Sequence, residues 1–483
     1  MEESSGRVNR AHEEYGYGWV VVAATFFVCF IADGLFYSFG TMFVELLEYF
    51  QQDRASTVVI GSIQFGFMYI IGPVAGALSN IYGCRIIVVI GAIISCTAFV
   101  ISSFATSVLY LCITYGSLGG VGLGLMFLPA GVCVIQHFTK RRALANGIAC
   151  CGSGVGTFVM NHLTRYLLDQ YGVRGTMMLQ GGLALQGVVL GLLLLPPKQD
   201  TGEQELETFP VKDKHTLNKK KIRQTYSEGT CCSCLFSSKG KNHNLDLEQT
   251  TFDVNRTSDI QISDTGNSLN NNSEEKMQCL KRLARLIFNR ELLTSVMFWS
   301  FLFCNFTVQL AYTIPFNLLP DQSVEKGISK LDVSWLMSSI GITNTIGRVL
   351  LGGLADRKCV DRLSMLKIVL LMTGLSTAVS PLFTTFGTKL LYACFYGFLV
   401  GGYVVLCPVV LADLFGTDLI AQSFGLWLFA CGLAGSIASP IGGWLFDMTG
   451  TYDTTFLVAG IEFVVGGLLL FIPKCMVNAK RKR

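Results

Sequence analysis

This chain of 483 residues has little charge: Lys, Arg, Asp and Glu together make up 14% of it. Soluble proteins average about 25% charged residues, and a water-facing surface cannot be built from the smaller share. The composition therefore excludes a soluble multidomain enzyme. The net charge is only +4, and the basic residues gather at the chain ends and between apolar runs. The sequence thus gives no support to nucleic-acid binding.

Motifs that would supply chemistry are also missing. The sequence has no G-x-x-x-x-G-K-[ST] phosphate loop, no H-E-x-x-H zinc pair and no G-x-S-x-G nucleophile turn. We therefore predict that the chain is not an enzyme and that it uses no cofactor and no metal. Its start lacks a short apolar stretch with a small-residue cleavage site, so no cleaved signal peptide is expected.

The chain is rich instead in apolar runs, and hydrophobic residues make up 51% of it. A membrane helix needs about 20 apolar residues, and twelve such runs form two blocks of six. The runs are 18–43, 58–79, 86–103, 108–135, 143–168, 176–195, 292–317, 331–354, 368–386, 390–411, 423–446 and 454–472. We predict an all-α polytopic membrane protein with 12 transmembrane helices in two six-helix halves.

The segments outside the two blocks are polar. The N-terminal half covers 18–195 and the C-terminal half covers 292–472. The segment 196–291 between them is rich in Asn, Ser, Lys and acidic residues and cannot bury enough apolar area to fold alone. We expect it to be a disordered cytosolic linker. A cytosolic tail at 1–17 and a basic cytosolic tail at 473–483 complete the chain.

The placement of Lys and Arg predicts the orientation. These residues are more frequent on the side that holds both termini and the linker, and cytosolic loops carry such an excess. None of the 17 cysteines falls in a loop predicted to lie outside, which fits reduced thiols without a disulfide framework. We therefore predict a multi-pass protein of the plasma membrane with both termini in the cytosol.

A short motif recurs at the same place in each block. It reads Gly76-Ala-Leu-Ser-Asn80-Ile-Tyr-Gly83-Cys-Arg85 after the second run and Gly352-Gly-Leu-Ala-Asp356-Arg357 after the eighth. Both copies are similar to the G-x-L-x-(D/N) loop motif of major facilitator proteins. A tight glycine turn there places a polar acceptor and basic residues near a neighbouring helix terminus, where charge interacts with the helix dipole. The resemblance implies the major facilitator fold, in which one half rocks against the other around a site at mid-membrane.

The start of the fifth run resembles a signature of the monocarboxylate transporter family. The matching residues are Lys140, Arg141, Arg142, Gly147, Gly152 and Gly156. The first-helix signature of the same family is matched by Gly16, Gly18 and Trp19, with Tyr15 and Tyr17 as departures. The spacing of the glycines favours close packing of helices. The resemblance implies a secondary transporter, and it allows a single-span immunoglobulin-like glycoprotein as an ancillary partner.

Charge inside a membrane span is costly and usually functional. Apart from Asp332 at the very start of the eighth run, the runs contain Asp33, His162, Arg165, Arg348 and Glu462. Arg348 matches the arginine that binds the substrate carboxylate in the family's lactate carriers. A guanidinium cannot lose its charge and can bind a carboxylate through two hydrogen bonds. The alternative is a structural arginine that pairs with a helix terminus or with the acidic residue of the second loop motif.

Two departures from the lactate carriers concern proton coupling. Those carriers have an Asp one turn before the arginine, where this chain has Asn344, and a Lys in the first helix, where it has Tyr37. Tyr37 shares a helix face with Asp33. Asp33 either replaces the missing acid as a proton site, or meets an ammonium group on the substrate, or has a local role at a helix kink. The predicted substrate-binding residues are Arg348, Asp33, Tyr37 and Asn344.

The other charged residues of the spans are predicted to be structural, with Arg165 extending to water. Aromatic residues are candidates for lining the pathway. They are Phe36, Tyr37, Tyr69, Phe301, Phe303, Tyr312 and Tyr396.

We predict a secondary transporter that moves a small monocarboxylate or a related organic anion across the lipid bilayer by alternating access. Symport with a proton stays open. One alternative is a facilitative carrier of aromatic amino acids, thyroid hormone, creatine or carnitine without proton coupling. Another is a non-transporting receptor on a transporter fold.

Overall fold

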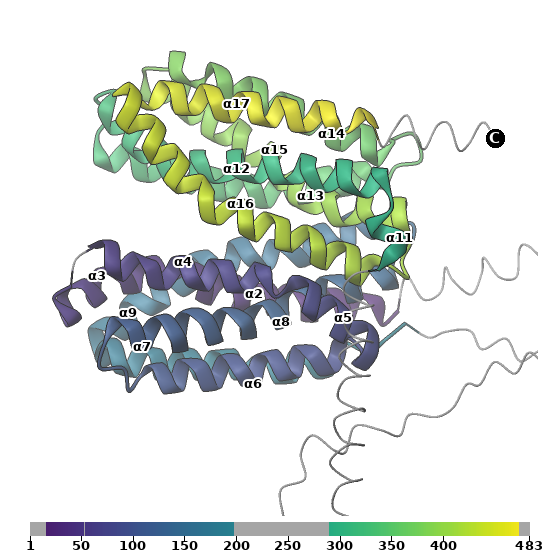
Figure 1. Ribbon diagram of the computed structural model, residues 1–483, viewed down its shortest axis with the longest axis horizontal. Coiled ribbons are helices and arrows are strands. Elements are labelled where there is room, and N and C mark those ends of the chain that lie inside the picture. Colours follow the sequence, from purple (N-terminus) through teal and green to yellow (C-terminus); the bar gives the residue numbers. More distant parts are fainter. Residues whose placement is uncertain (1–15, 53, 198–288, 473–483) are drawn as a thin grey trace, which may run out of the picture. The chain divides into compact units, whose positions relative to one another are not determined.

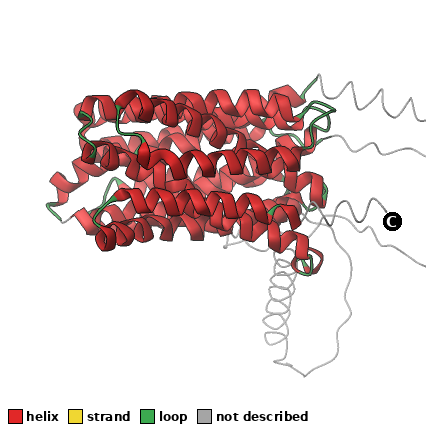
Figure 2. Ribbon diagram, turned by 90° about the horizontal axis from the view of Figure 1, so that it is seen from above, coloured by secondary structure: helices red, strands yellow, loops and turns green. Residues whose placement is uncertain are grey.

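A computed structural model describes residues 16–52, 54–197 and 289–472, and these residues form helices and short loops without a β-strand (Figure 2). The predicted linker and the two predicted tails lie outside the described residues except for their edges. The described helices belong to one compact unit.

The first half has nine helical segments. They are α2 (Gly18–Tyr37), α3 (Phe39–Phe50), α4 (Arg54–Ile70), α5 (Gly72–Tyr82), α6 (Cys84–Ser102), α7 (Val108–Leu111), the π-helix η1 (Cys112–Leu118), α8 (Gly119–His137) and α9 (Arg142–Leu192). The second half has α11 (Arg290–Leu293), α12 (Val296–Glu325), α13 (Lys330–Ala355), α14 (Arg362–Val379), the 3₁₀-helix η3 (Ser380–Leu382), α15 (Phe386–Phe415), α16 (Ile420–Thr449) and α17 (Tyr452–Leu469).

Several predicted runs contain a broken helix. α4 and α5 meet at Ile71 with a bend of 42°, and Pro73 lies at the start of α5. α9 contains both the fifth and the sixth run, and it is interrupted at Gly172, whose φ is 65°. A positive φ favours glycine, because glycine has no Cβ to clash there. Both ends of α9 lie near the start of α2, because Tyr17 contacts Leu193 and Trp19 contacts Phe138, so its two parts run in opposite directions.

Nine of the described helices are long and apolar enough to span a membrane, or ten if the bent pair of α4 and α5 counts as one span. α9 is long enough for two spans. α13 is not one of these helices, because Ser, Thr, Asn344 and Arg348 interrupt its apolar residues. These numbers are consistent with the predicted 12 spans, and the polar helix is the one that carries Arg348.

Each half has its own hydrophobic core. One core lies wholly within the first half, between Val21 and Leu194. The other fills the second half and extends into Ala75, Val132 and Ala143 of the first half. Figure 1 shows the helices of the two halves in separate colours, purple to teal and green to yellow. The shared residues show where the halves pack together.

Helices of the two halves approach closely at glycines. α13 packs against α9, and α16 packs against α4 and α5. A Cβ on Gly72 of α5 would lie 2.6 Å from the carbonyl oxygen of Gly425 in α16. A Cβ on Gly147 of α9 would lie 2.5 Å from the carbonyl oxygen of Arg348 in α13. Small residues at such crossings let helix backbones touch, so side chains do not separate the halves here.

One end of the bundle is where the linker leaves it, and we call it the linker end. The Tyr17 hydroxyl donates to the Leu193 carbonyl oxygen at 2.8 Å, so α2 begins where α9 ends. The Trp19 ring lies 5.3 Å from that of Phe138, in the loop between α8 and α9. The opposite end is called the far end.

Candidate functional site

Arg348 lies where α13 crosses α9. Its side chain is buried, with 8% of the residue exposed. Nη1 donates to the carbonyl oxygen of Cys150 in α9, and this hydrogen bond joins the two halves. The buried Nε has no hydrogen-bond partner among the described residues. A charged donor group therefore remains available in the interior.

Asn344 lies one turn before Arg348 on α13. The residue is 6% exposed, and its Nδ2 is a second buried donor without a partner among the described residues. Residues four apart share a helix face, so these two side chains extend from one side of α13. Leaving a buried polar group without a partner costs about 1–3 kcal/mol. A ligand with two acceptor atoms would remove this cost.

Asp33 is contributed by α2 of the other half. It is 4% exposed, and the Ser153 hydroxyl on α9 donates a hydrogen bond to its carboxylate. It lies within electrostatic range of Arg348, but the two form none of the ion pairs found among the described residues. A negative group and a positive group thus lie on opposite halves without neutralising each other directly.

Tyrosines surround these groups. Tyr37 is 43% exposed, and its hydroxyl lies within electrostatic range of Asp33, Tyr312 and Arg348. Those neighbours come from both halves, so Tyr37 lies near the contact between the halves. The Tyr396 hydroxyl donates to the Tyr312 carbonyl oxygen at 2.8 Å and so supports α12 beside the site.

The other aromatic candidates fall into two groups, those near the site and those away from it. Phe36 contacts Phe65, and Tyr69 lies within electrostatic range of Tyr37 and Asp33. Phe301 is fully buried in the core of the second half, whereas Phe303 is 60% exposed on the outside of α12. These two phenylalanines do not contribute to the site, and a hydropathy pattern could not have separated them from those that do.

Cysteines are neighbours that the sequence pattern did not reveal. Cys29, Cys150 and Cys151 lie within electrostatic range of Arg348. The Cys151 thiol donates to the Thr345 carbonyl oxygen at 3.5 Å, again from α9 to α13. Thiols are common in apolar cores, so a cysteine carries no signal of its position.

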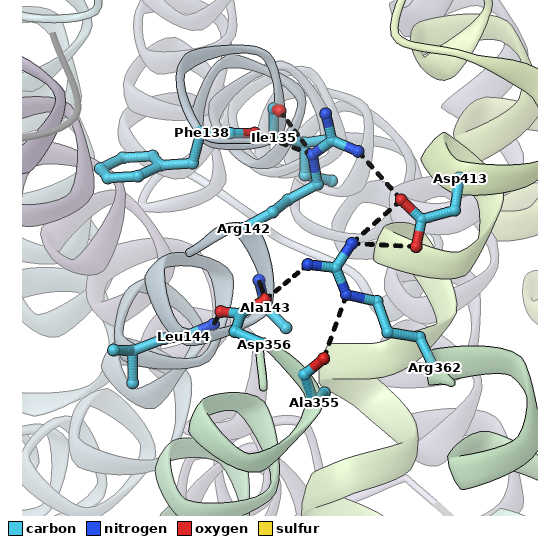
Figure 3. Close-up of polar contacts among 9 residues, drawn as sticks. All are labelled: Ile135, Phe138, Arg142, Ala143, Leu144, Ala355, Asp356, Arg362 and Asp413. Atoms are coloured by element: carbon cyan, nitrogen blue, oxygen red, sulfur yellow. Dashed lines mark hydrogen bonds and ion pairs between the residues drawn. The ribbon is translucent and has the colours of Figure 1, made fainter. Parts of the chain in front are cut away.

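A network of charged groups lies at the linker end (Figure 3). Asp356, just after α13, accepts from the backbone N–H groups of Ala143 at 3.1 Å and of Leu144 at 2.7 Å. These N–H groups belong to the first turn of α9, where the helix dipole favours a negative charge. Asp356 thus bonds the second half to the first.

Asp413 of α15 provides the second connection. It accepts from Arg142 Nη1 at 3.2 Å and from Arg362 Nη1 at 3.0 Å. Arg142 also donates through Nε to the Phe138 carbonyl oxygen at 2.9 Å, and Arg362 donates through Nη2 to Asp356 at 2.7 Å. We refer to Arg142, Asp356, Arg362 and Asp413 as the linker-end network.

The ion pairs of the described residues at the far end stay within one half. Arg165 pairs with Glu45 at 2.8 Å and with Asp169 at 3.0 Å, all in the first half. Lys326 pairs with Asp453 at 2.8 Å in the second half. Among the described residues, the ion pair that joins the halves, Arg142 with Asp413, therefore lies at the linker end.

The two loop motifs are alike in their glycines and differ in their polar residue. A Cβ on Gly76 would overlap the Ala421 carbonyl oxygen at the start of α16, and one on Gly352 would lie 2.7 Å from the Ala143 carbonyl oxygen. Asp356 bonds the start of α9, whereas its counterpart Asn80 is exposed. Of the other motif residues, Gly83 has a φ of 84°, and Arg85 and Arg357 are exposed.

The family-signature residues pack α9 against its neighbours. A Cβ on Gly152 would overlap the Phe26 carbonyl oxygen of α2, and one on Gly156 would overlap that of Phe30. The Gly16 carbonyl oxygen accepts from Trp19 N at 3.3 Å, and Gly18 is buried. Lys140 and Arg141 are exposed in the loop before α9.

The Gly152→Ala variant is expected to be less stable than the parent protein by about 1–3 kcal/mol, because its methyl group would meet backbone and not a movable side chain. The measurement is thermal unfolding of the purified protein. Gly182→Ala is the matched control, because a Cβ there meets nothing within 4 Å. Equal unfolding temperatures for the two variants would contradict the close crossing of α2 and α9.

The remaining charged residues of the spans lie away from the site. His162 Nδ1 lies 2.8 Å from the Phe158 carbonyl oxygen on the outside of α9. The Arg165 side chain is 54% exposed. Glu462 lines a small crevice with Leu310 and Leu445, and its Oε2 has no hydrogen-bond partner among the described residues.

Known proteins are similar to this chain over almost its full length. The family model described as Major Facilitator Superfamily matches residues 25–301 and 301–482. Monocarboxylate transporter 14 of Homo sapiens is 30% identical, over 97% of this chain and 92% of its own length. The mouse form, from Mus musculus, is 31% identical with the same coverage. Monocarboxylate transporter 12 of Xenopus laevis is 29% identical, over 100% of this chain and 94% of its own length.

Solved structures share the fold. The proton:xylose symporter XylE matches with a TM-score of 0.64 and 14% identity, over 94% of this chain and 95% of its own. The human organic anion transporter MFSD10 matches with a TM-score of 0.64 and 13% identity, over 94% and 99%. The predicted all-α fold of two six-helix halves is thereby confirmed.

Proposed function

Because this chain belongs to the monocarboxylate transporter family of the major facilitator superfamily, we propose that it carries a small organic anion whose carboxylate binds to Arg348. Membership of this family makes the chain a secondary transporter in a membrane and not an enzyme. The observation that carries the proposal is the pair of buried donors without partners, Arg348 Nε and Asn344 Nδ2. A carboxylate has two oxygens and accepts such donors with charge-assisted hydrogen bonds.

Asp33 contributes the negatively charged group of the proposed site. It lies on the opposite half from Arg348, and the two form no ion pair among the described residues. Its carboxylate can therefore interact with a proton or with the substrate. It either holds a proton that moves with the anion or meets a cationic group on the same substrate. Tyr37, which interacts with both, supplies a ring and a hydroxyl to the bound molecule.

The position of the charged contacts supports alternating access. The linker-end network closes one end of the region between the halves. The motif residues Gly76, Asn80, Gly83, Arg85, Gly352, Asp356 and Arg357 are proposed to act in this motion. Among them, Gly352 and Asp356 contact the start of α9, and Gly76 contacts the start of α16. In the cycle that we propose, the network opens as the far end closes, and the substrate is exposed to each side in turn.

The proposed setting is the plasma membrane, with the linker end and both termini in the cytosol. The excess of Lys and Arg at this end supports the orientation. The family relationship supports testing a single-span immunoglobulin-like glycoprotein as an ancillary subunit, by co-expression and co-purification.

The experiment that tests the proposed function is uptake into liposomes that contain the purified protein. The panel is lactate, pyruvate, aromatic amino acids, creatine, carnitine and thyroid hormone, each with and without a pH gradient. Saturable uptake of at least one carboxylate is expected. Uptake that is indifferent to the pH gradient would favour a facilitative carrier. Binding of a panel member without flux would favour a receptor and overturn the carrier proposal.

Asp33→Asn separates the two roles of the carboxylate. If Asp33 holds the transported proton, the variant is expected to lose the pH dependence of uptake, because the amide does not titrate. If Asp33 meets a cationic group, the variant is expected to lose affinity for zwitterions and to keep its affinity for simple anions. A variant that matches the parent protein in rate, pH dependence and substrate preference would contradict both roles.

A further inference from the structure

A groove of about 440 Å³ lies between α13 and α15, apart from the candidate substrate site. It is lined by Asp332, Trp335, Ser339, Ile342, Phe386 and Leu390, among others. These residues belong to the first half of α13 and the first turns of α15. Both helices begin at the far end, because α13 reaches the linker end at Asp356. Nothing in the transport mechanism above uses them.

The face of α13 that borders the groove is apolar and exposed. Trp335 is 64% exposed, Ile342 is 61% exposed and Leu350 is 58% exposed. Their spacing of seven and eight residues places them on one face of α13. Arg348 and Asn344 lie on the buried side of the same helix. A large exposed apolar face on a membrane helix is expected to face lipid, so the groove should be reached from the bilayer.

One acidic residue, Asp332, lines this groove. Asp332 is in the first turn of α13, and the Ser329 hydroxyl donates to its Oδ2 at 2.8 Å. The same hydroxyl accepts from Asp332 N at 3.2 Å and so caps the helix. The helix dipole stabilises a negative charge in this turn. The groove therefore has a carboxylate, that of Asp332, next to apolar side chains such as those of Trp335 and Ile342.

We propose that the groove binds a cationic amphiphile with a single alkyl chain. Its ammonium head pairs with Asp332, and its chain lies along Trp335 and Ile342. A charge-assisted hydrogen bond is roughly twice as strong as a neutral one, and the indole ring attracts a cation as well as a chain. The carboxylate thus favours an amine over a fatty alcohol or a sterol.

The test uses the full-length protein in nanodiscs of a neutral phosphatidylcholine. The probes are an alkylamine with a brominated chain and the alcohol of the same chain, and the readout is quenching of tryptophan fluorescence. The amine is expected to quench saturably, at a concentration about tenfold below that of the alcohol. Trp335→Phe should remove the saturable component, and Asp332→Asn should weaken it about tenfold.

Two variants control for lipid-facing tryptophan and for surface charge. Trp444, on α16, is 59% exposed, and Asp169 is an exposed acid at the far end. Trp444→Phe and Asp169→Asn should leave the saturable component unchanged. Equal quenching by amine and alcohol, or an unchanged response in Asp332→Asn, would overturn the proposal and leave an ordinary lipid surface. Displacement of the alcohol by a sterol, with no preference for the amine, would overturn it in favour of a sterol site.

Discussion

Uptake of the transported anion is expected to fall by about 10- to 100-fold in the Arg348→Ala variant, because hydrogen bonds to charged groups contribute about 1.5–3 kcal/mol each. The substitution removes the buried guanidinium with its Nε, which has no partner among the described residues, and the bond from Nη1 to the Cys150 carbonyl oxygen. The measurement is initial uptake by cells, with the amount of surface protein determined in parallel by biotinylation.

Arg348→Lys tests geometry separately from charge. A lysine keeps the positive charge but lacks the planar fork that binds both oxygens of a carboxylate. We therefore expect Arg348→Lys to recover only part of the uptake. Arg165→Ala is the matched control, because Arg165 is an exposed arginine of a span and exposed ion pairs contribute little. Parent-like uptake by Arg348→Ala at equal surface amount would contradict carboxylate binding.

The residues of the candidate site differ in how far the sequence reveals them. Asp33 and Arg348 stand out because charge inside an apolar run is rare. Asn344 stands out only through the comparison with a family pattern. The partner of Arg348 is a backbone carbonyl group, that of Cys150. Every residue except the last has such a group available, so no sequence pattern could have predicted this contact.

The contacts of the linker-end network also could not be predicted in full from the sequence. The loop motif predicts a polar acceptor near a helix terminus, and the structure places Asp356 beside the start of α9. Arg362 and Asp413 were not predicted as partners, because charge in a loop or at a helix end is ordinary. The pair of Arg142 and Asp413 joins residues 271 positions apart. Only the folded arrangement of the halves brings them together.

The fold could be predicted more fully than the site. Length and hydropathy indicate most of the spans, and the glycine at position 172 explains how one long helix contains two runs. α13 is the exception, because it is less apolar than the helices that hydropathy alone identifies as spans. The polar residues that lower it include Arg348 and Asn344. This polar helix thus carries two of the four candidate substrate residues, and α2 carries the other two, Asp33 and Tyr37.

Removing the Asp356 carboxylate is expected to shift the protein toward a state that is open at the linker end. Asp356→Ala loses both bonds to the first turn of α9. Their combined contribution is about 2–3 kcal/mol after allowance for overlap, a factor of about 30 to 150 in the balance between the two states. Because turnover needs both states, the maximal rate should fall. Hydrogen–deuterium exchange should quicken at the amides of Ala143 and Leu144.

A control variant separates this effect from a general loss of stability. Asp453→Asn breaks the ion pair with Lys326, which has a length of 2.8 Å but stays within the second half. It should leave exchange at the start of α9 unchanged. Asp356→Asn together with Asp413→Asn should shift the states by less than the sum of the single effects, because both acids bind Arg362. Strictly additive effects would mean that the two acids act separately and that the network is not one closing device.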